Sequence, residues 1–191
     1  PDVTPRVAAA GPAYIVLAGI SFSHFLNDTM QSLIASVYPI LKDAYALDFA
    51  QIGLITLAFQ FTASLLQPVI GHVTDKKAQP FSLAVGMGFT FFGLILLSMA
   101  HHYGVILLAA SLVGLGSAVF HPEATRMARH AAAGRQGLAQ GLFQVGGHAG
   151  YAIGPLLAAA IVVPRGQSSL TWFSIVVLVA MVLMSWTASR Y

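Results

Sequence analysis

Six long apolar segments, separated by short loops, follow one another along the 191-residue chain. A helix needs about 20 mostly apolar residues to cross the hydrocarbon layer of a membrane. The composition agrees, because 57% of the residues are hydrophobic and only 8% are charged, against about 25% charged residues in soluble domains. We therefore expect an all-α integral membrane protein. Its flexible N-terminal lead would cover 1–13, and one six-helix domain would cover 14–191, with spans at about 14–41, 51–73, 81–100, 105–126, 138–163 and 170–189.

Basic residues are distributed unevenly between the two sides of this predicted bundle. Only Lys42 and Arg165 fall on one side, whereas seven basic residues fall on the other: Arg6, Lys76, Lys77, Arg126, Arg129, Arg135 and Arg190. Cytoplasmic loops carry the excess of Lys and Arg, so both termini are expected to be cytoplasmic. The same residues are dispersed among loops and form no basic patch, which argues against a nucleic-acid partner.

One carboxylate, Asp28, lies deep inside the first apolar segment. At a rise of about 1.5 Å per residue it is roughly 24 Å from Pro12, well inside the hydrocarbon layer. His24 and Gln31 share its helix face, and Asn27 is its neighbour. A buried charge costs at least about 2.5 kcal/mol in a membrane and normally faces a bundle interior or a wet cavity. We expect a proton or substrate site here; the alternative is a structural carboxylate paired with a neighbouring helix.

The fourth segment contains His121-Pro122-Glu123. Pro122 removes a backbone donor and should kink the helix. Glu123 falls near the cytoplasmic edge and lies three residues before Arg126, so a structural ion pair and a functional acid are both open. Asp28 is the deeper acid and the stronger candidate.

The fifth segment has two contrasting faces. Gly146, Gly150 and Gly154 repeat every four residues, which allows another backbone to approach closely. Gln144 and His148 lie on roughly the opposite face, where His148 would either line a cavity or donate to a neighbouring helix. The second segment also carries a polar stripe, from Thr56 through Gln60, Ser64 and Gln67 to Gly71, which is expected to face protein or a cavity.

No metal site or cofactor is expected from the sequence. His101 and His102 follow the third segment, and a metal site there would need further ligands nearby. The chain has no cysteine, which excludes disulfides and thiol chemistry.

Two motifs resemble signatures of the major facilitator superfamily. The loop after the second segment, Gly71-His-Val-Thr-Asp75-Lys76, is similar to the first half of that family's loop motif, whereas Lys77-Ala78-Gln79-Pro80 departs from the second half. In the family this loop steadies one conformational state, and the resemblance assigns Gly71, Asp75 and Lys76 to it, together with Arg126 and Arg129 across the loop. The spacing of Gly141, Gly150 and Gly154-Pro155 is similar to the proton-antiporter signature.

Within the superfamily, the amino-acid sequences of several segments resemble those of the fosmidomycin resistance proteins. The similar pieces include Ser23-His24-Phe25-Leu26-Asn27-Asp28, Ser64-Leu65-Leu66-Gln67-Pro68, Val119-Phe120-His121-Pro122-Glu123 and Phe143-Gln144-Val145-Gly146-Gly147. The resemblance implies an inner-membrane pump that exports fosmidomycin-like or other small drugs against proton entry, with no cofactor besides the coupling proton. The polar first helix and the His-Pro-Glu segment would then line the central path.

The resemblance also bears on the architecture. Members of the superfamily have two six-helix halves, and this chain resembles the N-terminal half, built from two inverted three-helix repeats. It would need a second six-helix half as a partner, either a C-terminal half or another copy in a homodimer.

Two other functions are alternatives to a transporter half. An isolated half that does not transport is one alternative. A rhomboid-like intramembrane serine protease is the other, suggested by six spans, Ser117 and several histidines; against it, Ser117 lies in Gly-Leu-Gly-Ser-Ala and the last segment contains no histidine.

Overall fold

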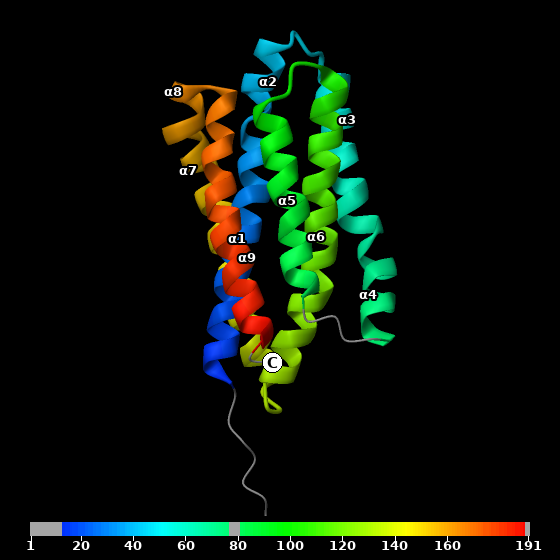
Figure 1. Cartoon of the computed structure of the whole chain (residues 1–191), viewed down its shortest axis with the longest axis vertical. Coiled ribbons are helices and arrows are strands. Elements are labelled where there is room, and N and C mark those ends of the chain that lie inside the picture. The colour runs from blue at the N-terminus through cyan, green and yellow to red at the C-terminus, as the bar shows by residue number, and fades with distance from the viewer. Residues whose placement is uncertain (1–12, 77–80, 190–191) are drawn as a thin grey trace, which may run out of the picture.

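The computed structural model describes residues 13–76 and 81–189, which are almost entirely helical and contain no strand (Figure 1). The expected all-α fold is therefore confirmed. In chain order the elements are α1 (Tyr14–Ser36), α2 (Tyr38–Ala44), α3 (Phe49–Gln60), η1 (Phe61–Leu65), α4 (Gln67–Lys76), α5 (Ser82–Ser98), α6 (Tyr103–Ala131), α7 (Gln136–Leu157), η2 (Ala158–Val162), α8 (Val163–Arg165), η3 (Gln167–Ser169) and α9 (Leu170–Ser189).

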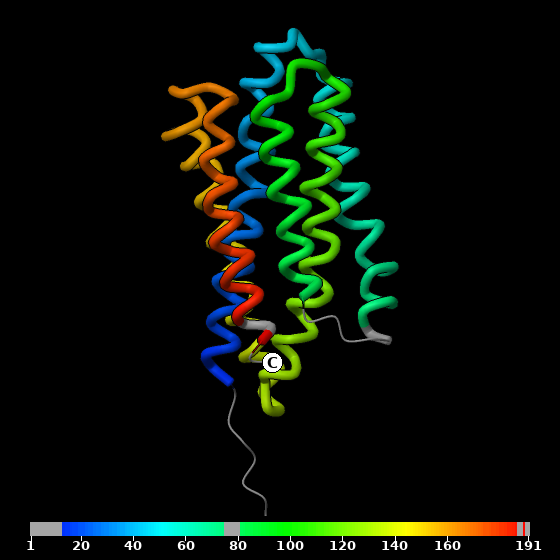
Figure 2. Tube along the Cα trace, in the orientation of Figure 1, coloured from blue at the N-terminus to red at the C-terminus, as the bar shows by residue number. Residues whose placement is uncertain are grey.

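These elements form long, roughly parallel rods at the positions of the expected spans (Figure 2). The first rod is α1 followed by α2, with a break at Val37 because Pro39 cannot donate to the helix ladder. The second is α3, the π-helical turn η1 and α4, and the fifth is α7, η2 and α8. The predicted flexible lead over residues 1–13 lies outside the described residues except for Ala13.

Length and composition alone identify four of the rods as membrane spans: Phe49–Thr74, Tyr103–Ala131, Gln136–Arg165 and Gln167–Trp186. Helix α5 is apolar but has 17 residues. Helix α1 is long enough, but its buried polar residues, including His24, Asn27 and Asp28, lower its mean hydropathy. The two remaining helices are thus α5, which is short, and α1, whose apolar sequence is interrupted by a polar cluster.

The bundle consists of two three-helix groups that interlock. The first helix of each group packs against the middle rod of the other: α1 lies along α7, and α6 lies along α3, η1 and α4. The third helices, α5 and α9, pack against each other, while α5 also packs on α6 and α9 on α1. Helices α1 and α6 therefore occupy corresponding places in the two groups.

Glycines allow α1 and α7 to approach closely. A Cβ atom added at Gly150 would overlap the carbonyl of Phe25 and lie 2.9 Å from the amide of Thr29, and one at Gly154 would lie 2.8 Å from the amide of Leu33. Gly146 meets Ser21 in the same way. This contact fixes which residues of α7 face the middle of α1.

Two of the chain's helix ends lie together at one end of the bundle. The amide of Ala13, just before α1, donates to the carbonyl of Ala131 at the end of α6, at 2.9 Å. Helix α9 ends near this end of the bundle, whereas α2 and α8 lie at the opposite end (Figure 1).

Candidate functional site

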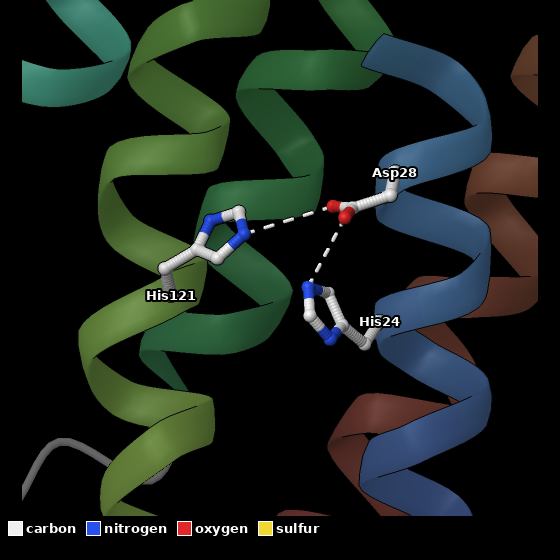
Figure 3. Close-up of side chains that lie close together, drawn as sticks. All are labelled: His24, Asp28 and His121. Atoms are coloured by element: carbon white, nitrogen blue, oxygen red, sulfur yellow. Dashed lines mark ion pairs between the residues drawn. The ribbon is translucent and has the colours of Figure 1, made fainter. Parts of the chain in front are cut away.

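Asp28 lies near the middle of α1, between two histidines (Figure 3). Its side chain is 7% exposed, and its Oδ2 atom lies 3.2 Å from Nε2 of His24, one turn earlier on the same helix. Its Oδ1 atom lies 3.6 Å from Nε2 of His121, which comes from α6. His121, from a helix distant in the sequence, thus lies against the polar face of α1 that the sequence predicts.

Amide side chains surround the same carboxylate. Asn27 Nδ2 and Gln31 Nε2 donate to Oδ1 of Asp28, at 2.9 and 3.1 Å. The hydroxyl of Ser117 on α6 donates to Oε1 of Gln31 at 3.3 Å, so the network extends from α1 to α6. Because Oδ1 accepts two hydrogen bonds, any proton held by the Asp28 carboxyl is placed at Oδ2, which faces His24.

The hydrogen bonds of the two rings fix their neutral tautomers. Nδ1 of His24 lies 2.8 Å from the carbonyl oxygen of Phe143, and Nδ1 of His121 lies 3.0 Å from that of Ser117. A carbonyl oxygen only accepts, so each Nδ1 carries a hydrogen. In the neutral rings, each Nε2 then presents a lone pair toward Asp28. Two lone pairs and a carboxylate converge, and this arrangement suits a proton or another cation.

Helix α7 closes the site without contributing a charged group. The ring of Phe143 stacks on His24 with centroids 4.0 Å apart. A Cβ atom added at Gly147 would lie 2.6 Å from Nε2 of His24 and 2.8 Å from Oδ2 of Asp28. Gly147 therefore leaves the space that the His24–Asp28 pair occupies. Neither the glycine repeat nor the antiporter-like spacing in the sequence includes this glycine.

A cleft of about 320 Å³ leads to the site from the surface. His121, whose side chain is 26% exposed, lies in its wall, and Asp28 lies behind it. The other lining residues are mostly polar or small: Gln67, Gly71, Pro122, Thr125, Arg129, Gln140, Phe143 and Gln144. The cleft thus joins the second, fourth and fifth rods.

Comparison with known proteins assigns the family. The sequence profile of the Major Facilitator Superfamily matches residues 20–190. The chain belongs to the major facilitator superfamily. It is 52% identical over 95% of its length to the fosmidomycin resistance protein of Escherichia coli (strain K12), and 40% identical over 93% to the uncharacterized MFS-type transporter YfnC of Bacillus subtilis (strain 168). It covers 45% and 44% of these two relatives, so it spans less than half of their length.

Members of this superfamily are transporters and not enzymes, so the family assignment does not favour the protease interpretation. Ser117 does lie 3.1 Å from Nδ1 of His121. Its side chain is buried, however, and its hydroxyl donates to Gln31. The Ser–His contact is therefore one link in the network around Asp28.

Glu123 lies apart from this network. Its side chain is 1% exposed and pairs with Arg126 on the same helix. Arg126 Nη1 also donates to the carbonyl of Thr74 on α4, at 2.6 Å. Of the two alternatives, the geometry shows an ion pair that ties α6 to the end of α4.

The remaining candidates are spread over other surfaces. Gln144 lines the cleft, and His148 is exposed on α7. Gly71 faces Pro122 and Arg129 is exposed beside it in the cleft, whereas the side chains of Asp75 and Lys76 lie outside the described residues. In the glycine signature, Gly141 and Pro155 are exposed, while Gly146, Gly150 and Gly154 are buried against α1.

Proposed function

We propose that this chain is the N-terminal half of a proton-coupled exporter of fosmidomycin-like or other small drugs. The observation that carries the proposal is the His24–Asp28–His121 cluster, in which a buried carboxylate at mid-span faces the Nε2 atoms of two imidazoles. The fosmidomycin resistance protein of E. coli, 52% identical over the shared region, supports the substrate class and the direction of transport.

The cluster suits a proton that binds and leaves during each cycle. With Nδ1 of His24 donating to Phe143, a single proton between Nε2 and Oδ2 turns the repulsion between a lone pair and a carboxylate into a hydrogen bond. It also cancels the charge of Asp28, which lowers the cost of keeping α1 in a water-poor state. Proton flux would thereby bias the alternation between states.

The substrate would bind in the cleft, against a second six-helix half. Exposed polar side chains on the rods beside it, including Gln60, Ser64 and His148, would be costly against lipid. Superfamily transporters bind substrate near the midplane between two such halves. Arg129, Gln140 and Gln144 in the cleft favour a small polar compound. The second half is either a C-terminal domain or another copy of this chain.

We place the protein in the inner membrane with both termini inside. The end of the bundle that holds Ala13 and Ala131 also holds Arg126 and Arg129, whereas Lys42 and Arg165 lie in α2 and α8 at the other end. The excess of basic residues marks the cytoplasmic side.

The test replaces the carboxylate in the complete two-half transporter, reconstituted in liposomes with a pH gradient. Asp28→Asn should abolish export driven by the gradient, because the variant has no acid at this position. Exchange of labelled for unlabelled substrate without a gradient should continue, since the cleft is unchanged. Asp43→Asn, at an exposed acid in α2, is the matched control and should transport normally. Full gradient-driven export by Asp28→Asn would overturn the proposal.

A further inference from the structure

The three groups around Asp28 have the composition of a transition-metal site. One ring nitrogen of His24, a carboxylate oxygen of Asp28 and one ring nitrogen of His121 all lie within 4.8 Å of one another. Imidazole nitrogens are preferred ligands of Zn²⁺ and its neighbours, whereas Mg²⁺ and Ca²⁺ prefer oxygen. We propose that this cluster binds a divalent transition-metal ion of the Zn²⁺ class. The inference goes beyond the proposed function and does not depend on the coupling ion or on the direction of transport.

The distances are close to those of a formed site. With metal–ligand distances of about 2.0–2.1 Å, two ligands of a tetrahedral ion lie about 3.4 Å apart. Nε2 of His24 lies 3.2 Å from Oδ2 of Asp28, and Nε2 of His121 lies 3.6 Å from Oδ1, the other oxygen of the same carboxylate. The largest separation in the cluster exceeds the ideal, so the ion would draw one ligand inward. His121 is the ligand freest to move, because it is 26% exposed while His24 is 4% exposed.

The tautomers required for metal binding are already set. A metal-ligating histidine usually donates its other ring N–H to a carbonyl or carboxylate, which orients the ring. Both histidines do so here, His24 to the carbonyl of Phe143 and His121 to that of Ser117. The two Nε2 atoms therefore face the same carboxylate, as Figure 3 shows. A histidine that merely packed in the core would not need its Nε2 to face an acid.

The neighbours of the cluster also favour an added cation. Asn27 and Gln31 orient the Asp28 carboxylate by donating to Oδ1. Oδ1 of Asn27 is buried and has no hydrogen-bond partner among the described residues, so a water on the ion could donate to it. Three protein ligands leave a fourth position for such a water or for a small anion. An ion would enter through the cleft, where His121 forms part of the wall.

The experiment uses the whole chain, purified in detergent and treated with a chelator. Co²⁺ is titrated first, because four-coordinate Co²⁺ absorbs visible light much more strongly than the hydrated ion. We expect one Co²⁺ per chain, a four-coordinate spectrum, and loss of that spectrum when Zn²⁺ displaces Co²⁺. Mg²⁺ at the same concentration should leave the spectrum unchanged. Absence of the four-coordinate spectrum would overturn the proposal.

Variants then locate the ion. His24→Gln, Asp28→Asn and His121→Gln should each weaken Zn²⁺ binding by at least about 100-fold, because even the loss of an orienting partner costs about 10–100-fold. The matched control is the double variant His101→Gln/His102→Gln, which removes two exposed histidines from the loop before α6 and should bind Zn²⁺ as the native chain does. Binding lost in the control and kept in the three variants would place the ion on the surface and overturn the proposal.

A measurement on the native chain covers the case in which a variant fails to fold. X-ray absorption of the Zn²⁺-loaded chain should show two imidazole ligands and oxygen in the remaining positions; an all-oxygen shell would contradict the site. These experiments contain no substrate, and the transport assays contain a chelator. Failure of metal binding and failure of proton-coupled export are therefore separate results.

Discussion

Nε2 of His121 on α6 lies 3.6 Å from Oδ1 of Asp28 on α1. These helices are the first members of the two three-helix groups, so the contact joins the groups at their centre. A second link runs beside it, because Ser117, one turn before His121, donates to Gln31, which in turn donates to Asp28. The carboxylate is therefore held from both groups, and a change of charge on Asp28 is felt by both.

Replacement of His121 tests this link. His121→Gln keeps a polar side chain in the cleft wall but removes the basic group that faces Asp28. The loss of a contact with a charged group costs about 1.5–3 kcal/mol. We therefore expect gradient-driven export by the complete transporter to fall by about tenfold or more. His101→Gln, at an exposed histidine, is the control, and equal rates in both variants would contradict a role for His121 at Asp28.

Substitution of Gly147 tests whether the His24–Asp28 pair needs the space that this glycine leaves. In Gly147→Ala, the new methyl group would lie 2.6 Å from Nε2 of His24 and 2.8 Å from Oδ2 of Asp28, so these side chains must separate. Export should fall strongly, while the free energy of unfolding should decrease by about 1–3 kcal/mol, as in other overpacked cores. Transport assays and denaturant titrations of the same preparation measure the two effects.

The matched control for that substitution is Gly137→Ala on the same helix. A Cβ atom at Gly137 has no heavy-atom neighbour within 4 Å, so export should be unchanged and a helical alanine should if anything stabilise the chain. Normal export by Gly147→Ala would mean that His24 and Asp28 can separate without loss of function.

The sequence predicts the polar face of α1, but it does not predict that His121 lies opposite Asp28. His24, Asp28 and Gln31 follow from helical spacing alone, because one helix defines its own faces. The position of His121 opposite Asp28 depends on how far α6 and α7 are shifted along the axis of α1. That register is set by close contacts such as Gly150 against Phe25, which hydropathy does not report.

Helix ends and the role of Gly147 depend on similar contacts. The fourth apolar segment is predicted to end near Arg126, and helix α6 continues to Ala131, with Arg126 paired with Glu123 and donating to the carbonyl of Thr74. Gly147 has a sequence signal only as one more glycine in a glycine-rich helix. Its role at the site is visible once the distance to His24 is known.

The Glu123–Arg126 pair predicts a stability defect distinct from a transport defect. Glu123→Gln would leave the Arg126 guanidinium without the carboxylate that pairs with it in a mostly buried place. Breaking a buried pair by removing one partner costs about 3–5 kcal/mol. We expect a lower thermal midpoint for Glu123→Gln, with partial recovery in the double variant Glu123→Gln/Arg126→Gln, as a double-mutant cycle would show. A full and additive loss in the double variant would contradict the pairing.

The glycines of the α7 signature should differ in whether they tolerate substitution by alanine. At Gly150, an added Cβ would overlap the carbonyl of Phe25 and lie 2.9 Å from the amide of Thr29. Both are backbone atoms of α1, so relief requires the whole helix to move, and we expect Gly150→Ala to lower the free energy of unfolding by about 3 kcal/mol, the upper end for overpacking.

Gly141, one of the other glycines of the signature, has no heavy atom within 4 Å of an added Cβ and is exposed. Gly141→Ala should therefore leave stability unchanged or slightly raised in this chain. If Gly141→Ala nevertheless impairs export by the complete transporter, the methyl group must meet the second six-helix half. If Gly150→Ala is as stable as Gly141→Ala, the close approach of α1 and α7 described here is wrong, and with it the register that brings Gly147 to His24 and Asp28.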